Sequence, residues 1–329
     1  VEHHDTGETG TPALPMDIIF AKGENYKVKF SQALDNGGKV DARINYQDAA
    51  HLMNNFTFRT TMMSMQRFAQ TDVESYGYHF TYEKDNWLVG LDGDQAEHNA
   101  TMFSPSPMMA NFYLENYKGV ERDRHSIFAE WKGELNASWK LETGLRYTRV
   151  SMDADTVDSS MAMMSAPLKA LRDQFNNADR SQDDNLVDLT AVFSHKVNNN
   201  FDVELGLARK ERAPSYQERY LWATMQSTSG LADGNNYVGD INLDQETAYQ
   251  AELGFDWHTP KAAFSPRIFY HHINDYIQGT AVTDANVISL STAMGGDTTP
   301  LQFSNVDAKL YGMDANWFVA VTNTWQLDG

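Results

Sequence analysis

Residues 127–148, IFAEWKGELNASWKLETGLRYT, alternate between apolar and polar side chains in two consecutive runs. The apolar positions are Ile127, Ala129, Trp131 and Leu135 in the first run, and Trp139, Leu141, Leu145 and Tyr147 in the second. Side chains alternate between the two faces of a strand, whereas a helix repeats every 3.6 residues. The period of two therefore predicts two antiparallel strands joined by the short turn Leu135–Ser138.

The same period recurs along the chain, for example at 187–193 and 249–257. Further short turns are expected at Lys84–Asn86, Val197–Asn200, His258–Lys261 and Val321–Thr324. Between them come long polar loops, at approximately 54–72, 99–120, 153–184, 212–245 and 280–300, in which we expect little hydrophobic core. Short turns that alternate with long loops are typical of a transmembrane β-barrel, in which the two kinds of connection face opposite sides of the membrane.

Composition limits the possible functions. The 329 residues carry a formal net charge of −19, which argues against nucleic acid as a partner. The chain has no cysteine, which excludes disulfides, cysteine-based zinc sites and thiol catalysis. Its apolar runs are too short for a transmembrane helix. Both ends of the sequence look cut, so we expect an internal fragment.

The aromatic residues favour a barrel wall over a soluble sheet. Trp87, Trp139, Phe201 and Trp257 stand beside the expected short turns, where a transmembrane barrel places an interfacial aromatic girdle. About eleven or twelve strands of the required length fit into the chain. The alternative is that these aromatics form the core of a soluble β-protein.

Two segments carry a resemblance to a known family. They read ARKERAPSYQERYLW at 208–222 and GNNYVGDINLDQETAYQAELGF at 234–255. They resemble the late-barrel signature of TonB-dependent outer-membrane receptors, which Arg212, Ala213, Pro214, Ser215, Glu218, Arg219, Leu243, Glu246, Thr247, Glu252 and Gly254 match. The usual prolines of the second element are absent. Pro214 suits a strand end because it cannot donate to the ladder.

The resemblance implies that residues 1–329 form an incomplete antiparallel transmembrane β-barrel. About 11–12 of roughly 22 strands would be present, and the plug domain would be absent. The whole protein would sit in the Gram-negative outer membrane among lipid and lipopolysaccharide. It would contact the TonB complex through the missing plug.

A candidate metal site lies in AAHLMNNFTFRTTMMSM, residues 49–65. In the preceding segment Val40, Ala42 and Ile44 alternate with polar residues that we assign to the lumen. His51 and Met53 continue the luminal parity, and their spacing of two places both side chains on one face of a strand. Imidazole and thioether ligands suit copper, whereas Mg²⁺ and Ca²⁺ prefer oxygen. Two ligands do not complete a site, and the remainder would come from the plug.

The same segment is similar to the His-x-Met-Asp-Asn-aromatic segment of TonB-dependent copper receptors. His51 and Met53 match the ligand positions of that subgroup, and Asn54 replaces its usual aspartate. The segment 144–158 also looks like the subgroup's pattern. The resemblance implies copper as the transported substrate.

Methionine usage adds a second possible copper-binding feature. Eleven of the fifteen methionines fall in the expected long loops: Met62, Met63, Met65, Met102, Met108, Met109, Met161, Met163, Met164, Met225 and Met294. They could collect copper, or they could pack the loops together over the mouth of the barrel. His98 with Met102 is a looser candidate for a second copper contact.

Three functions stay open at this point. The first is copper import by a TonB-dependent receptor, the second is import of a siderophore, haem or another metal chelate, and the third is a passive porin or adhesin barrel. A chelate site would favour loops rich in arginine and tyrosine. No nucleophile–base set, phosphate loop or carboxylate dyad stands out, so an enzyme is not expected.

Overall fold

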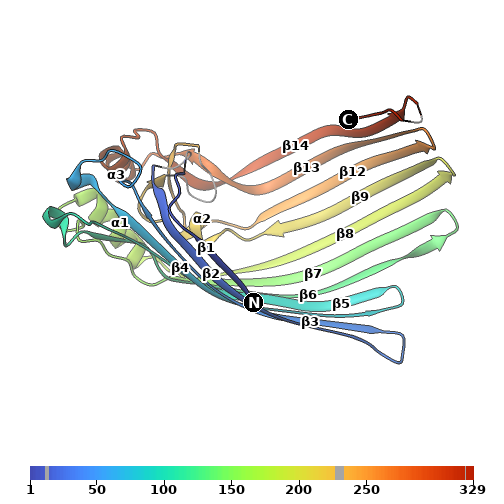
Figure 1. Cartoon of the computed structure of the whole chain (residues 1–329), viewed down its shortest axis with the longest axis horizontal. Helices are drawn as coiled ribbons and strands as arrows, with labels where there is room; N and C mark the ends of the chain where they lie inside the picture. The colour runs from blue at the N-terminus through green and yellow to red at the C-terminus, as the bar shows by residue number, and fades with distance from the viewer. Residues whose placement is uncertain (12–14, 227–232, 323) are drawn as a thin grey trace.

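The computed structural model describes residues 1–11, 15–226, 233–322 and 324–329. In this part of the chain the period-two runs form one sheet of 15 strands. Eleven of them are long and build a curved wall (Figure 1): β2 (Asp17–Ala33), β3 (Lys39–Asn54), β4 (Phe68–Lys84), β5 (Trp87–Phe103), β6 (Tyr113–Asn136), β7 (Trp139–Asp153), β8 (Gln182–Asn198), β9 (Phe201–Arg212), β12 (Glu246–Thr259), β13 (Ala262–Ala281) and β14 (Leu301–Ala320). The short ones are β1 (Glu2–Thr6), β10 (Met225–Gln226), β11 (Asn236–Val238) and β15 (Gln326–Asp328).

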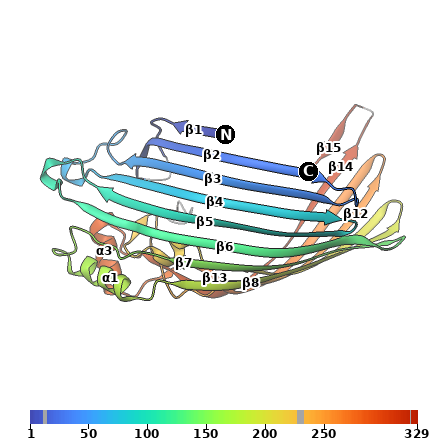
Figure 2. The same cartoon turned by 90° about the horizontal axis from the view of Figure 1, so that it is seen from below.

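The long strands pair with their neighbours in sequence order, and every pair among them is antiparallel. Short turns join them at one end, and long connections join them at the other. Figure 2 shows the wall as an open, curved sheet, and the sheet order does not close on itself in the described residues. The expected antiparallel, incomplete β-barrel wall is thus confirmed, and its long strands number eleven.

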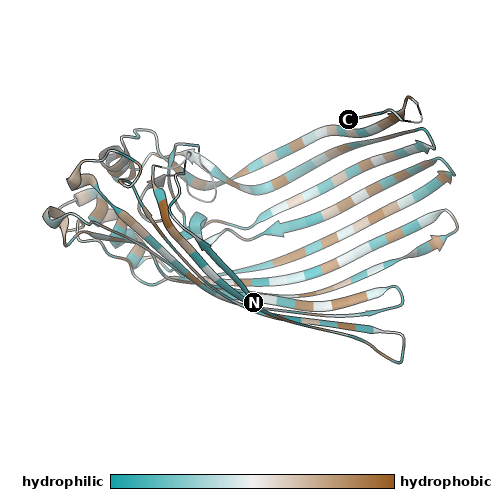
Figure 3. Cartoon of the chain, in the orientation of Figure 1, coloured by the Kyte–Doolittle hydropathy of each residue, from teal (hydrophilic) through white to brown (hydrophobic). Residues whose placement is uncertain are grey.

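In contrast to a soluble protein, the wall exposes apolar side chains on one face and buries polar side chains on the other. Leu91, Ile127 and Tyr147 lie opposite one another on three strands, and their side chains are 42%, 63% and 42% exposed. The adjacent row, which faces the other way, contains polar side chains that are buried, such as Asp92 and Ser126. Figure 3 shows the alternation along the strands. An exposed apolar face suits lipid, so the alternative of a soluble aromatic core is wrong.

Aromatic side chains border the exposed apolar face at both ends. Near the short turns Trp257 lies opposite Phe264, which lies opposite Trp317. Toward the long loops Tyr46 packs between Tyr26 and Tyr76, with ring centroids 6.2 and 5.0 Å apart. Two such rows are the girdles that a transmembrane barrel places at its two interfaces.

The long connections were expected to be polar loops with little core, and this expectation is wrong. They contain the helices α1 (Ala166–Asn177), α2 (Tyr216–Tyr220) and α3 (Ala285–Gly295), and the 3₁₀ turns η1 (Met63–Met65) and η2 (Pro107–Met109). The main cluster of buried apolar side chains lies among these loops and the adjoining ends of the strands. In α1 the apolar residues Leu168, Leu171 and Phe175 follow helical spacing, so one face of the helix is buried.

Most of the expected loop boundaries agree with the structure. One does not, because β5 continues to Phe103 and β6 begins at Tyr113, so the loop expected at 99–120 is limited to 104–112. Met102 is therefore a strand residue. No helix of the described residues is long and apolar enough to cross a membrane.

Candidate metal centre

His51 and Met53 lie on the inner face of the wall, at the end of β3 that leads into a long loop. Met53 lies opposite Ala69 of β4, which lies opposite Met102 of β5. Met102 packs against the buried core of the loops, inside the curved wall. Residues directly opposite one another share a face, so Met53 faces inward, and so does His51 two residues before it.

The spacing of His51 and Met53 along β3 would allow both side chains to approach one ion. Residues two apart on a strand have Cα atoms about 6.6 Å apart, a separation that an imidazole and a thioether can span by converging. The neighbours of His51 on the same face are small, since it lies opposite Ala21 on one side and Thr71 on the other. No hydrogen bond joins the His51 ring to any described residue.

The pair forms only part of a metal site. Among the described residues there is no group of three His, Cys, Asp or Glu side chains that could hold a metal ion. A copper ion bound by His51 and Met53 would therefore need further ligands from outside this set.

Asn54, which replaces the aspartate of the copper-receptor pattern, lies on the opposite side of β3 from Met53. Its Oδ1 accepts hydrogen bonds from the backbone N–H groups of Phe56 and Thr57, at 3.0 and 2.9 Å. Its Nδ2 donates to the Thr57 hydroxyl at 2.8 Å. Asn54 is buried and forms an Asx turn that ends the strand. It therefore positions the loop and does not contact the two candidate ligands.

An ion pair anchors the loop that follows the candidate site. The Arg59 guanidinium donates to both carboxylate oxygens of Asp17, with its Nη2 3.0 Å from Oδ1. Asp17 is 1% exposed and pairs with Asn54 at the loop ends of β2 and β3. The hydrogen bonds from Arg59 lower the pKa of the Asp17 carboxyl below its usual value. The loop is thereby tied to β2, the strand that pairs with the one that carries His51.

His98 and Met102 do not form a second site together. They are four residues apart on β5, which separates their Cα atoms by about 13 Å. The His98 ring stacks on Tyr216 with centroids 4.1 Å apart, and its Nδ1 is buried without a hydrogen-bond partner in the described residues. His98 thus packs against the loops at the mouth of the barrel. His271 and His272 point to opposite faces, as expected from their adjacency, and His271 bonds inward to Glu252.

Most of the loop methionines are exposed. The exposed side chains are those of Met62, Met63, Met65, Met108, Met163, Met164 and Met294. Met109 and Met161 pack against the buried core. The side chain of Met225 lies outside the described residues. Packing between loops therefore accounts for two of these methionines and leaves seven thioethers in contact with solvent.

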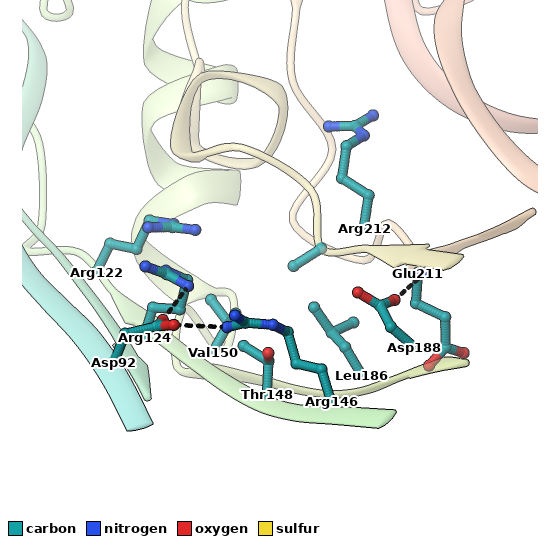
Figure 4. A pocket seen from close by; sticks show the side chains of 11 residues that line it. Asp92, Arg122, Arg124, Arg146, Thr148, Val150, Leu186, Asp188, Glu211 and Arg212 are labelled. Carbon is teal, nitrogen blue, oxygen red and sulfur yellow. Dashed lines mark hydrogen bonds and ion pairs between the residues drawn. The ribbon is translucent and has the colours of Figure 1, made fainter. Parts of the chain in front are cut away.

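A second inward-facing feature is a cavity of about 390 Å³ (Figure 4). The side chains of Arg122, Arg124, Arg146 and Arg212 line it, together with those of Asp92 and Asp188. This cavity is not predicted by any motif of the sequence. The alternation of the sequence gives Arg122, Arg124 and Arg146 the inward parity on two neighbouring strands. Only the register between the strands shows that their side chains lie close together.

Ion pairs hold the arginines of the cavity in place. Asp92 binds both Arg124, at 3.0 Å, and Arg146, at 2.8 Å. Asp94 binds Arg122, at 3.0 Å, and Arg124, at 2.6 Å. Three guanidinium groups thus share two carboxylates, and Asp188 and Glu211 add two further acidic residues to the lining.

Arginines of the segment at 208–222 also bind carboxylates. Arg212, the last residue of β9, binds Glu218 at 2.8 Å and Glu246 at 2.7 Å. Arg219 is buried and binds Asp184 at 2.6 Å. A Ser215–Glu218 capping box begins α2 directly after the strand. The segment therefore fixes the loop inside the wall and is structural.

Comparison with known proteins agrees with this architecture. Residues 7–329 match the protein-family model described as TonB dependent receptor-like, beta-barrel. No curated protein sequence matches the chain. Among solved structures, the copper transporter OprC has a TM-score of 0.73 at 19% identity, and the match covers 96% of this chain and 46% of that one.

Two other receptor structures have the same fold. A double mutant of the Serratia marcescens hemophore receptor HasR, in complex with its hemophore HasA and heme, has a TM-score of 0.60 at 13% identity over 92% of this chain and 46% of that one. The alcaligin receptor FauA from Bordetella pertussis has 0.56 at 12% identity over 95% and 48%. At these identities the likeness shows the fold alone, and the chain spans about half the length of each structure. The family match over nearly the whole chain shows that this protein belongs to the TonB-dependent receptors, and that the chain corresponds to a large part of the β-barrel of that family.

Proposed function

We propose that this chain is part of an outer-membrane receptor that binds copper at the outer mouth of its barrel and imports it with energy from the TonB complex. One observation carries the proposal: His51 and Met53 face inward together, at the loop end of β3, with no hydrogen bond to the His51 ring in the described residues. The similarity in fold to a copper transporter supports it. The activity is transport and not catalysis.

In this mechanism the wall supplies half of the copper site. The imidazole and the thioether are soft or borderline ligands that prefer copper to hard cations. The remaining ligands would come from a plug domain inside the barrel. Movement of the plug, driven by TonB, would then break up the site and release the ion into the lumen. Lipid and lipopolysaccharide of a Gram-negative outer membrane would surround the wall.

Copper titration of the full-length receptor tests the ligands. We expect the double substitution His51→Ala with Met53→Ala to weaken copper binding by roughly a hundredfold or more. Loss of a partner that merely orients a ligand already costs about 10–100-fold. Isothermal titration of the purified receptor with Cu(I) under reducing conditions, and with Cu(II), gives the affinities.

The matched control removes the same side-chain types from the outward face. His272→Ala with Met313→Ala changes one histidine and one methionine, both of outward parity on β13 and β14. Its copper affinity should equal that of the wild type. Equal affinity in all three proteins would refute the assignment of His51 and Met53 as ligands.

A second candidate function is import of an anionic metal chelate, such as a siderophore or haem. The arginine-lined cavity favours it, because the guanidinium groups of Arg122, Arg124 and Arg146 could donate charge-assisted hydrogen bonds to an anion. Two of the structures compared with this chain are receptors for such ligands or their carriers.

Growth of a strain that lacks the receptor separates the two functions. Loss of copper-dependent growth or of copper-enzyme activity supports copper import, whereas iron starvation supports the chelate. Titration with ferric citrate provides a direct probe. The chelate function predicts that Arg122→Gln with Arg146→Gln weakens binding at least tenfold, while copper import predicts no measurable binding to either protein.

A further inference from the structure

The inner face of the wall places a second methionine level with Met53. Met53 of β3 lies opposite Ala69 of β4, and Ala69 lies opposite Met102 of β5, so the three residues form one inward-facing row. The register of both strand pairs is continuous through these residues. Neighbouring strands lie about 4.8 Å apart, which separates the Cα atoms of the two methionines by about 10 Å. One small side chain therefore stands between two thioethers on the same face.

The thioethers of Met53 and Met102 can reach a common ion from these positions. A methionine side chain is unbranched and has three rotatable bonds, so its sulfur can lean toward a neighbouring strand. A bond between a metal ion and sulfur is about 2.3 Å long, which shortens the span that the two side chains must cover. The wall is curved and its inner face is the concave one (Figure 2), so inward side chains on different strands converge.

The side chains around Met102 leave its sulfur free toward β3. His51 lies opposite Thr71 in the next row, so the side chain of β4 beside the imidazole is also small. On the side away from Met53, Met102 lies opposite Leu114, which is 1% exposed. The apolar contact with β6 holds Met102 in place without offering its sulfur a polar partner.

Hard ligands are absent from the inward positions at this level, within residues 49–53, 69–73 and 98–102. The inward side chains there are those of Ala49, His51, Met53, Ala69, Thr71, Val73, His98, Ala100 and Met102. None of them is a carboxylate, which Mg²⁺ and Ca²⁺ prefer. The His98 ring is stacked on Tyr216 and lies about 13 Å along the strand from Met102. The soft donors that remain are one imidazole and two thioethers.

We propose that Met102 is a third ligand from the wall to the copper ion that His51 and Met53 bind, and that the site takes copper as Cu(I). Thioether sulfur is a soft ligand and favours Cu(I), whereas imidazole serves either oxidation state, so a second thioether shifts the preference toward Cu(I). The inference rests on the proposed function and deepens it, since it adds a ligand and an oxidation state to the same site. Met102 differs from the exposed loop methionines because it stands in register with Met53.

Titration of the full-length receptor with Cu(I) under reducing conditions, and with Cu(II), tests the role of Met102. Met102→Leu removes the sulfur and keeps an apolar side chain of similar size. We expect it to weaken Cu(I) binding by roughly tenfold or more and Cu(II) binding by less than about threefold. The matched control is Met152→Leu, because Met152 is also a buried methionine near the loop end of its strand but lies on β7 opposite Arg122. The control should bind both ions like the wild type.

X-ray absorption at the copper edge, at saturating Cu(I), gives a second readout that does not depend on affinity. The wild type should show one more sulfur neighbour per copper ion than Met102→Leu, and Met152→Leu should match the wild type. Equal sulfur counts or equal Cu(I) affinities in the three proteins would overturn the role of Met102. Equal losses of Cu(I) and Cu(II) binding in Met102→Leu would overturn the assignment to Cu(I). A heat-modifiability gel confirms that each variant barrel is folded.

The double substitution His51→Ala with Met53→Ala separates this inference from the proposed function. If it loses copper binding while Met102→Leu binds like the wild type, the proposed function stands and the inference on Met102 fails. If the double substitution binds copper like the wild type, the proposed site itself fails.

Discussion

Asn54 determines where β3 ends and where the loop beside His51 begins. Its Oδ1 satisfies two backbone N–H groups that otherwise lack a partner at the turn. Asn54→Ala should destabilise the turn by about 1–2 kcal/mol. Asn54→Asp keeps the acceptor and should cost far less. Hydrogen exchange of residues 55–67 in the full-length receptor measures the difference, and equal exchange in both variants would contradict the role of the side chain.

The ion pair between Asp17 and Arg59 predicts how the same loop responds to pH. Both residues lie at the loop end of the strands, above the lipid-facing band. The pKa of Asp17 is lowered by its hydrogen bonds from Arg59, so the stabilisation is complete above the usual value of 3.8 and is lost as the pH falls through the lowered pKa. Acid should therefore loosen the loop only below about pH 4.

Comparison with Arg59→Gln measures this effect, because intrinsic exchange rates cancel in the ratio of the two proteins. The variant should exchange residues 55–67 faster than the wild type at pH 6, and the ratio should approach one as the pH falls below the lowered pKa. A ratio that stays constant with pH would show that Asp17 does not control the loop.

Individual side chains were predictable only where parity alone decides their position. The alternation through Val40 and Ile44 correctly places His51 and Met53 inward, since no bulge interrupts the pairing of β3 with β4. The meeting of Arg124 with Asp92 depends on the register between strands, which no local pattern encodes. That these inward residues bind copper stays a prediction.

Helix α1 illustrates what the long loops add at the scale of the element. Phe175 is 5% exposed and contacts Tyr220 edge-on, with centroids 6.4 Å apart. Phe175→Ala should destabilise the packed loops by about 3–5 kcal/mol. Met163→Ala, at a side chain that is 93% exposed, should change their stability by less than about 0.5 kcal/mol. Amide exchange of residues 166–177 in both variants measures these costs, and similar protection would contradict the packing of α1.

The strands were predictable from the sequence because a period of two persists over ten or more residues. Helix α1 also had a local signal, in Ser165 as N-cap and in the helical spacing of Leu168, Leu171 and Phe175. Helix α3 starts with the Asp284 cap and ends at Gly296 in the left-handed region, at φ 74°. Both signals are short, and each lies inside a connection whose polar composition suggests a loop. The core that these helices share forms only when segments far apart in the sequence pack together, so no local pattern predicts it.

At the scale of the whole molecule, each long strand passes through two different solvents. Its lower part contacts lipid, and the upper parts of β5, β6, β7, β8, β13 and β14 pack with loops around a core surrounded by water. Urea weakens burial from water, whereas the paired backbone of the wall has no alternative partner within lipid. We expect urea to unfold the loop core, reported by exchange of residues 154–181 and 282–300, before the wall loses its heat-modifiable gel shift. Coincident transitions would contradict two separately stabilised parts.

Peroxide has direct access to the seven exposed methionine side chains of the long loops. Methionine reacts with peroxide to give a sulfoxide, which is polar and presents oxygen instead of soft sulfur. Met163 and Met164, 93% and 75% exposed, would be converted first, while the half-buried Met53 would be shielded for longer. Peroxide would thus remove soft sulfur ligands from the exposed loops before it oxidises Met53 on the inner face of the wall.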